Sequence, residues 1–290
     1  MPSGWLRSTV LIKIPSSVMA ATLWRIADSS GPRLLSMWEA VAGCGSAHAF
    51  LIGHPGSEWQ ARMSTSPLEN PAWAALSGPH ASFAEQKGQV LRYPVDVSPF
   101  LAVPDHPDER VWHDIADLIG PGASTLVVGA VGTPPPADWT VEAELTGVQM
   151  DGSAAPAVAD AEAVPLTEAD VPEMLELVAR TKPGPFLPRT ITLGAYLGIR
   201  RDGVLVAMAG ERMHPPGWTE ISAVCTDPAF QGQGLAARLV LAVAAGIWER
   251  GERPFLHAAE TNTGAIRLYE KLGFRLARQM QFGAYRAPSR

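Results

Sequence analysis

The stretch 224–236 combines residue types that suit the binding of a phosphate group. An apolar run ends in Asp227-Pro228, and Gln231-Gly232-Gln233-Gly234 follows before an expected helix over 235–250. Glycines let the backbone turn sharply and come close to a ligand. The free N–H groups and the dipole at the start of a helix favour an anion there. A pyrophosphate suits this cradle, and a tight strand-to-helix turn without a ligand is the structural alternative.

A second patterned segment, 262–274, begins 28 residues after Gly234. Asn262 is of a type that caps helices, and apolar residues follow it at helical spacing. Gly273 suits the position just after a helix, where the backbone often turns left-handed. The segment therefore predicts a capped helix over 263–272.

Together the two segments resemble the acetyl-CoA motifs of the GNAT acetyltransferase superfamily. The first motif, Pro-x-x-Arg/Gln-Gly-x-Gly-x-Gly/Ala after an apolar strand, is matched by Pro228, Gln231, Gly232, Gly234 and Ala236. The second, Asn-x-x-Ala-x-x-x-Tyr-x-x-x-Gly-Phe, is matched by Asn262, Ala265, Tyr269, Gly273 and Phe274. The resemblance covers about residues 160–285 and implies acetyl-CoA as the acyl donor.

The resemblance also implies roles for single residues. The pantetheine arm would pair with the backbone of Val224, Cys225 and Thr226, as an added strand would. Amides would hold the pyrophosphate from Gln231, Gly232, Gln233, Gly234, Leu235 and Ala236. Asn262 would lie near the pantetheine or the acceptor, and Tyr269 would protonate the departing thiolate.

An amine acceptor also needs a base, because an alkylammonium group with a pKa of about 10.4 is not nucleophilic until it loses a proton. Glu220 is the first candidate, since it stands six residues before Thr226, the offset of the base in the histone-acetyltransferase-like members. Strand alternation predicts one shared face for Glu220, Ser222, Val224 and Thr226. Glu211 and Glu260 are the second and third candidates. The structural alternative for Glu220 is a solvated carboxylate at a strand end.

Other chemistry-bearing residues have simpler interpretations. His214 and His257 are interpreted as structural or surface histidines, and Cys225 as a small apolar filler rather than a nucleophile. For Tyr269 the structural alternative is a core aromatic residue. The glycine loop lacks the Lys-Ser/Thr of a P-loop, which disfavours a nucleotide site. A non-catalytic acyl-CoA-binding regulatory module stays open as the alternative to an N-acetyltransferase.

The elements that must position these residues follow the order β, α, β, β, β, α, β, α, β. A short strand is expected at 164–166, and Thr167 to Asp170 predicts an N-cap before a helix to about Arg180. Strands are expected at 195–200, 204–213, 218–226, 255–259 and 274–282. This order fits an α/β fold with a mixed sheet, the GNAT acyl-CoA N-acyltransferase fold, over 161–290.

The preceding half predicts a smaller, divergent α/β domain over 63–150, joined by a linker at 151–160 rich in Ala, Gly, Ser and Pro. Helices are expected near 72–76 and 108–119, and strands at 89–93, 100–103, 124–131 and 139–150. Residues 1–62 keep no clear period apart from a candidate helix at 32–42. Met63 is a candidate natural start.

Composition limits the function classes. The 290 residues are 47% hydrophobic and 18% charged, which indicates a globular protein. Residues 1–151 carry eight basic and fifteen acidic side chains. The sequence has no stripe of basic residues of the kind that would indicate a nucleic-acid partner. Two cysteines and no zinc spacing favour a reducing, cytoplasmic setting without a metal, and no apolar run suggests a membrane span. The acceptor stays open between a small amine, a peptide and a protein lysine, and the oligomeric state stays open, with a homodimer as one option.

Overall fold

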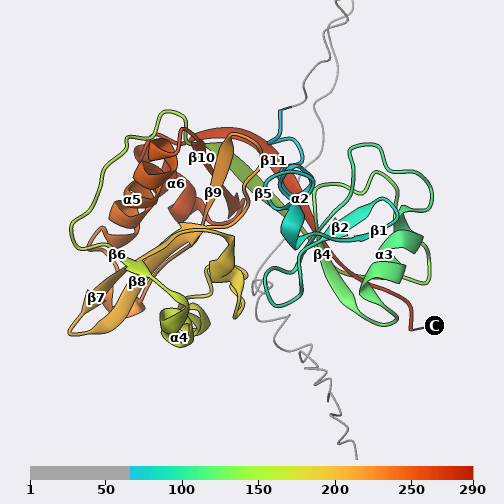
Figure 1. The fold of residues 1–290 in the computed structure, drawn as a ribbon, viewed down its shortest axis with the longest axis horizontal. Helices are drawn as coiled ribbons and strands as arrows, with labels where there is room; N and C mark the ends of the chain where they lie inside the picture. Colours follow the sequence, from blue (N-terminus) through green and yellow to red (C-terminus); the bar gives the residue numbers. More distant parts are fainter. Residues whose placement is uncertain (1–65, 290) are drawn as a thin grey trace, which may run out of the picture. The chain divides into compact units, whose positions relative to one another are not determined.

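The computed structural model describes residues 66–289, which belong to one compact unit (Figure 1). The predictions for residues 1–62 and for Met63 as a start lie outside the described residues, as does Cys44, one of the two cysteines. The helices are α2 (Pro71–Leu76), α3 (Val111–Ile119), α4 (Val171–Thr181), α5 (Leu235–Glu249) and α6 (Thr263–Lys271). Short 3-10 turns are η1 (Ala81–Phe83), η2 (Glu168–Asp170), η3 (Thr190–Leu193) and η4 (Pro228–Phe230).

Eleven strands form one mixed sheet in the order β1-β2-β3-β4-β11-β5-β10-β9-β8-β7-β6. The first five are β1 (Glu85–Lys87), β2 (Val90–Arg92), β3 (Phe100–Ala102), β4 (Ser124–Val128) and β5 (Thr140–Asp151). The others are β6 (Val164–Leu166), β7 (Tyr196–Arg201), β8 (Val204–Glu211), β9 (Trp218–Thr226), β10 (Arg253–Ala259) and β11 (Arg275–Arg286). The predicted α/β fold with a mixed sheet is confirmed, as is the order of elements after residue 163.

The sheet runs without a break across the predicted joint at 151–160. Strand β5 lies between β10 and β11 and pairs antiparallel with both. Residues after Asp151 are hydrogen-bonded to the C-terminal half of the chain. The Gly152 N–H donates to the Pro254 carbonyl, and Asp160 accepts two hydrogen bonds from Arg238. The division into two domains stays a prediction, and the two halves share one sheet.

The helices cover the two faces of the sheet. Figure 1 shows α5 and α4 on opposite sides of β7 and β8. Neighbouring strand residues separate accordingly: Met208 packs with the α4 cluster, and Ala209 packs with the α5 cluster. On β10, Leu256 joins the α5 cluster and Phe255 joins the cluster around α2. We therefore call the side of α5 and α6 the helix face, and the side of α2 and α4 the opposite face.

Local capping explains where several elements begin and end. Thr167 and Asp170 form the predicted capping box before α4, with side chain and backbone bonded reciprocally. The Asn262 side chain accepts a hydrogen bond from the Ala265 N–H at 3.1 Å and caps α6. Gly273 has φ of 92°, and a Cβ there would lie 2.8 Å from the Ala154 carbonyl oxygen, so only glycine fits.

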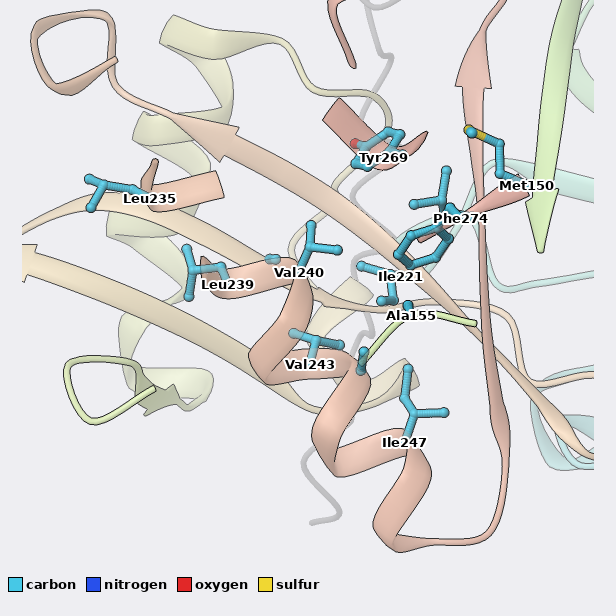
Figure 2. Packing of buried hydrophobic residues seen from close by; sticks show 14 of the residues in the cluster. Met150, Ala155, Ile221, Leu235, Leu239, Val240, Val243, Ile247, Tyr269 and Phe274 are labelled. Carbon is cyan, nitrogen blue, oxygen red and sulfur yellow. The ribbon is translucent and has the colours of Figure 1, made fainter. Parts of the chain in front are cut away.

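The helix-face core is built mainly from α5. Figure 2 shows Leu239, Val243 and Ile247 along its inward side. These side chains recur every three to four residues, which keeps one stripe of the helix on the sheet. Since α5 is anchored along its length, its N-terminus is held firmly beside the end of β9.

Candidate active site

The loop before α5 leaves the N-terminus of that helix uncovered. Gly232 and Gly234 have φ of 78° and 75°, in the left-handed region. Gly234 occupies the N-cap position without a side-chain cap, and no acidic residue lies in the first turn. Residues 231–234 are exposed. The first-turn N–H groups and the helix dipole are thus available to an anion.

Strands β9 and β10 diverge next to this loop. Their parallel pairing runs from Trp218↔Arg253 to Ile221↔Leu256 and ends there. Beyond that point β9 continues against β8, up to the pair Ala207↔Thr226, and β10 continues against β5. Beyond that point the facing edges of the two strands have no strand partner among residues 66–289, so an inserted extended chain could pair with them.

A β-bulge at Ala223 lies on the β9 side of this gap. Met208 pairs with Cys225 and Gly210 with Ser222, so two β9 residues oppose the single residue between them. Ala223 takes the left-handed conformation, with φ of 52°. A bulge of this kind re-aims the side chains and N–H groups that follow it.

The bulge makes one expectation from the sequence wrong. Strand alternation placed Glu220 and Val224 on one face. Ile221 and Val224 both pack in the helix-face core, whereas Ala223 and Cys225 pack with α4. The extra residue at the bulge reverses the alternation, so Glu220 and Val224 lie on opposite faces.

Tyr269 belongs to the helix face of the gap. Its ring packs near Phe274 in the core beside α5, as Figure 2 shows, and only 7% of the residue is exposed. Burial, with a contribution from Cys225, raises the pKa of Tyr269 to about 12. Its hydroxyl therefore stays protonated at neutral pH, as a proton donor must.

Glu220 lies on the opposite face and is fully buried. Arg212 Nε donates to Oε2 at 2.8 Å and Nη2 to Oε1 at 2.5 Å, which makes a bidentate pair. Burial alone would raise the pKa of Glu220, but the charge and hydrogen bonds of Arg212, with help from His257, lower it to about 2. The carboxylate is therefore ionised at neutral pH and engaged at both oxygens.

His257 joins this group, which sequence reasoning missed by interpreting it as structural. It is the first β10 residue beyond the last pair with β9. Its Nδ1 lies 2.8 Å from Glu220 Oε1, and its Nε2 lies 3.2 Å from Gln149 Nε2. The only sequence signal was its place on the strand after an expected apolar run, which also fits a core histidine.

The other carboxylate candidates lie elsewhere. Glu211 is buried and pairs with Arg250 at 2.7 Å, with His214 at 3.6 Å. Glu260 is exposed and accepts a hydrogen bond from Gln279. Among the described residues, neither of them hydrogen-bonds to His257, as Glu220 does.

Cys225 is buried in the α4 cluster. Burial raises the pKa of its thiol to about 11, so little thiolate forms at neutral pH. The interpretation as a filler rather than a nucleophile agrees with this. Within residues 66–289, no cluster of His, Cys, Asp or Glu could hold a metal ion, and no helix is long and apolar enough to cross a membrane.

A solved structure gives the decisive comparison. A protein from Novosphingobium aromaticivorans, described as a GNAT-family acetyltransferase, is 38% identical. The match covers 78% of this chain and 100% of that chain, with a TM-score of 0.70. The chain belongs to the GNAT family. The expectation from the two motifs is thereby confirmed.

Curated proteins and a family model match the part of the chain that holds the GNAT motifs. The model for FR47-like protein matches residues 196–282. N-alpha-acetyltransferase RimI of Mycobacterium tuberculosis is 33% identical over 120 residues, which cover 38% of this chain and 75% of that protein. Mycothiol acetyltransferase of Thermomonospora curvata is 39% identical over 82 residues, or 28% of this chain. The match spans only 27% of the length of that protein.

Proposed function

We propose that this GNAT protein transfers an acetyl group from acetyl-CoA to a primary amine by direct attack. The observation that carries the proposal is the divergence of β9 and β10 beside an uncapped helix N-terminus. A gap between two strands accepts an extended arm, and the helix N-terminus accepts a pyrophosphate. Both features together suit a phosphorylated carrier with a long linear arm.

The cofactor would occupy the gap from the helix face. Amides of residues 231–236 would hold the pyrophosphate, and the backbone of Val224, Cys225 and Thr226 would pair with the pantetheine arm. The Thr226 hydroxyl is buried and has no hydrogen-bond partner among the described residues, which leaves it free for a ligand. Asn262, which caps α6, would lie at the side of the arm.

The chemistry would use groups on both faces of the sheet. Tyr269, on the helix face, would protonate the thiolate as the C–S bond breaks. The thiol of CoA is a fair leaving group without help, so the proton donor contributes modestly. A β9 backbone N–H would stabilise the oxyanion. The carboxylate of Glu220 would stabilise the proton after it has left the acceptor ammonium, because a nearby negative charge favours the protonated form of a base.

The acceptor would enter from the opposite face, where the first half of the chain meets the loop after α4. The Arg189 N–H donates to the Asp96 carbonyl at 3.0 Å, and Thr190 Oγ1 donates to the Val97 carbonyl at 2.7 Å. This contact supports a role for both segments in choosing the acceptor. The names of the relatives point to two classes of acceptor, an N-alpha amine for RimI and mycothiol for mycothiol acetyltransferase, and a lysine side chain is a third.

The test is acetyl-CoA-dependent thiol release by the purified protein. Separate pools of small amines, amino acids, peptides with free N-termini and lysine peptides would serve as acceptors. Release with one pool, and a mass gain of one acetyl group on its amine, is the expected result. Tight binding of acetyl-CoA with no release in any pool would contradict the proposal and favour a non-catalytic acyl-CoA-binding module.

A further inference from the structure

The buried ion pair of Arg212 and Glu220 on the opposite face contacts the imidazole of His257 through the Glu220 carboxylate. We propose that His257 takes the proton from the acceptor amine, and that Glu220 is the positioning residue that holds its ring. The inference rests on the proposed acetyl transfer and names the group that activates its acceptor. The sequence had assigned that task to Glu220 alone.

The two neighbours of the ring define its tautomer. Ionised Glu220 only accepts hydrogen bonds, so its contact at 2.8 Å requires a proton on Nδ1. The Gln149 amide nitrogen only donates, so its contact at 3.2 Å requires a lone pair on Nε2. The same nitrogen donates to the Leu68 carbonyl at 2.9 Å, which fixes the orientation of the amide. Both neighbours therefore select the neutral Nδ1–H form, in which Nε2 is a base.

Glu220 is poorly arranged to take the proton directly. It is 0% exposed, and both of its oxygens accept from Arg212. Its lowered pKa makes it a weak proton acceptor. A buried carboxylate against Nδ1–H instead orients an imidazole and stabilises the imidazolium that forms.

His257 lies where an acceptor must reach the thioester. Parallel pairing of β9 and β10 ends at Leu256, one residue earlier. Phe255, two residues before it on the strand, packs in the α2 cluster, so alternation places the ring of His257 on the opposite face. Tyr269 belongs to the helix face. Acid and base would thus stand on the two sides of the gap.

An unpartnered acceptor beside the ring suits an ammonium group. Gln149 is fully buried, and its Oε1 has no hydrogen-bond partner among residues 66–289. A buried unpaired oxygen is unfavourable, because nothing replaces the hydrogen bonds that it made with water. An entering ammonium group would donate to this oxygen and would replace the Gln149 N–H at His257 Nε2. The side chain of His257 is 5% exposed, so this exchange is needed for contact.

The proton balance is complete without another reactant. One proton leaves the ammonium nitrogen for His257 Nε2 and passes on to solvent. The neutral amine forms the C–N bond, and the C–S bond breaks with the electron pair on sulfur. Tyr269 protonates that sulfur, and the second proton that nitrogen loses replaces the one from Tyr269 through solvent.

Within the described part of the chain, the ring of His257 has one charged side chain in direct contact, and its other neighbours are uncharged. Glu220 faces His257 from β9, and Arg212 stands behind Glu220 at the end of β8. Phe255 and Phe282 pack edge-on against the ring from β10 and β11, and neutral Gln149 faces it from β5. Among residues 66–289, the charges that act on the His257 ring by hydrogen bonding are thus the Glu220 carboxylate and, through it, the Arg212 guanidinium.

The test compares His257→Gln and Glu220→Gln with wild type, using the best alkylamine acceptor. His257→Gln should lower kcat about 100-fold or more, with the KM for acetyl-CoA unchanged within about twofold. The residual rate should rise about tenfold per pH unit from pH 7 to 9, because the free amine fraction rises so below a pKa of about 10.4. Glu220→Gln should lower kcat about tenfold or more.

His80→Gln is the matched control, since His80 is another buried histidine, and the one side-chain hydrogen bond that it makes among residues 66–289 is to the Tyr93 hydroxyl at 2.9 Å. His80→Gln should keep kcat within about threefold. A loss of kcat in His80→Gln as large as that in His257→Gln would show that the loss in His257→Gln comes from altered packing. Wild-type kcat and pH profile in His257→Gln, with a large loss in Glu220→Gln, would overturn the proposal and return the role of base to Glu220.

The tautomer of His257 is measured separately on the free protein, by nitrogen-15 NMR with long-range couplings. The Nδ1–H form is expected in wild type. Detection of the Nε2–H form would alone be enough to contradict the role of His257 as the base. Failure to acetylate any amine would contradict the acetyl transfer instead, so the two failures are distinguishable.

Discussion

The two sides of the gap between β9 and β10 are built by different means. On the helix face, the loop at 231–234 presents backbone N–H groups, and its two glycines take left-handed conformations. On the opposite face, the buried ion pair of Arg212 and Glu220 is hydrogen-bonded to His257, and the three residues come from separate parts of the chain. Backbone N–H groups suit the proposed cofactor, which is the same in every turnover. Titratable side chains suit the proposed acceptor, whose amine must lose a proton.

The difference also decides how each side fails. A backbone cradle depends on local conformation and on the absence of competing charge. A buried ion group depends on every member, because the loss of one leaves another charge uncompensated. The following predictions separate these two kinds of dependence.

Removal of Arg212 should have the largest effect on stability. Arg212→Met leaves the buried Glu220 carboxylate without its bidentate partner, and we expect a loss of about 3–5 kcal/mol in the free energy of unfolding. Denaturant unfolding measures it. The double variant Arg212→Met, Glu220→Gln should recover at least half of the loss. A single variant as stable as wild type would show that the ion pair is not buried as described.

A charge in the phosphate cradle should have the next largest effect, this time on binding. Gly234→Asp would place a carboxylate beside the proposed pyrophosphate site, and we expect acetyl-CoA binding to weaken about 100-fold or more. Calorimetry measures the Kd. Gly203→Asp is the matched control, because Gly203 also has positive φ, of 81°, and open space around its Cβ position. Equal weakening in both variants would contradict a phosphate site at 231–236.

Loss of the tyrosine hydroxyl should have a smaller effect, confined to turnover. Tyr269→Phe should lower kcat about 10- to 100-fold, because the thiolate then leaves unprotonated. The Kd of acetyl-CoA should change little. Steady-state kinetics at pH 7 with calorimetry measures both. A full kcat in the variant would remove Tyr269 from the mechanism and leave it as a core aromatic residue.

Acid should destabilise the opposite face, which holds Glu220, at a higher pH than it affects the loop at 231–234. The pKa of Glu220 is about 2 in the folded protein, below its ordinary value of 4.5, so its stabilising contribution is present above pH 4.5. That contribution is lost as the pH falls from 4.5 towards 2. Over this range, the free energy of unfolding should fall less steeply with decreasing pH in Glu220→Gln than in wild type. Identical curves would contradict the lowered pKa.

The smallest effect is expected for Cys225. Its buried thiol has a raised pKa and faces α4, so Cys225→Ala should keep kcat within about threefold. Mass spectrometry should find no acetylated Cys225 after mixing wild type with acetyl-CoA. An acetyl-cysteine that forms as fast as turnover would replace direct attack with a two-step route.

The sequence predicted the helix face better than the opposite face, and the reason is physical. Glycines at 232, 234 and 273 and the cap at Asn262 act within a few residues of themselves, so their types reveal their conformations. The bulge at Ala223 has no such signal, because alanine seldom takes a positive φ. It reversed the face of Val224 that alternation had predicted.

The charged group on the opposite face could not be predicted because its members meet through strand register. Glu220 is level with Phe255 across β9 and β10, and Gln149 is level with His257 across β5 and β10. Register between strands that are this distant in the chain is not encoded in local spacing. The insertion of β5 between β10 and β11 escaped prediction for the same reason.

A structure of the protein with acetyl-CoA tests the central claim most directly. The pyrophosphate should lie on the amides of residues 231–236, with the arm between β9 and β10. The thioester should then have the Tyr269 hydroxyl on one side and the ring of His257 on the other. Acetyl-CoA bound outside the gap, or a thioester with both groups on the same side, would contradict the account.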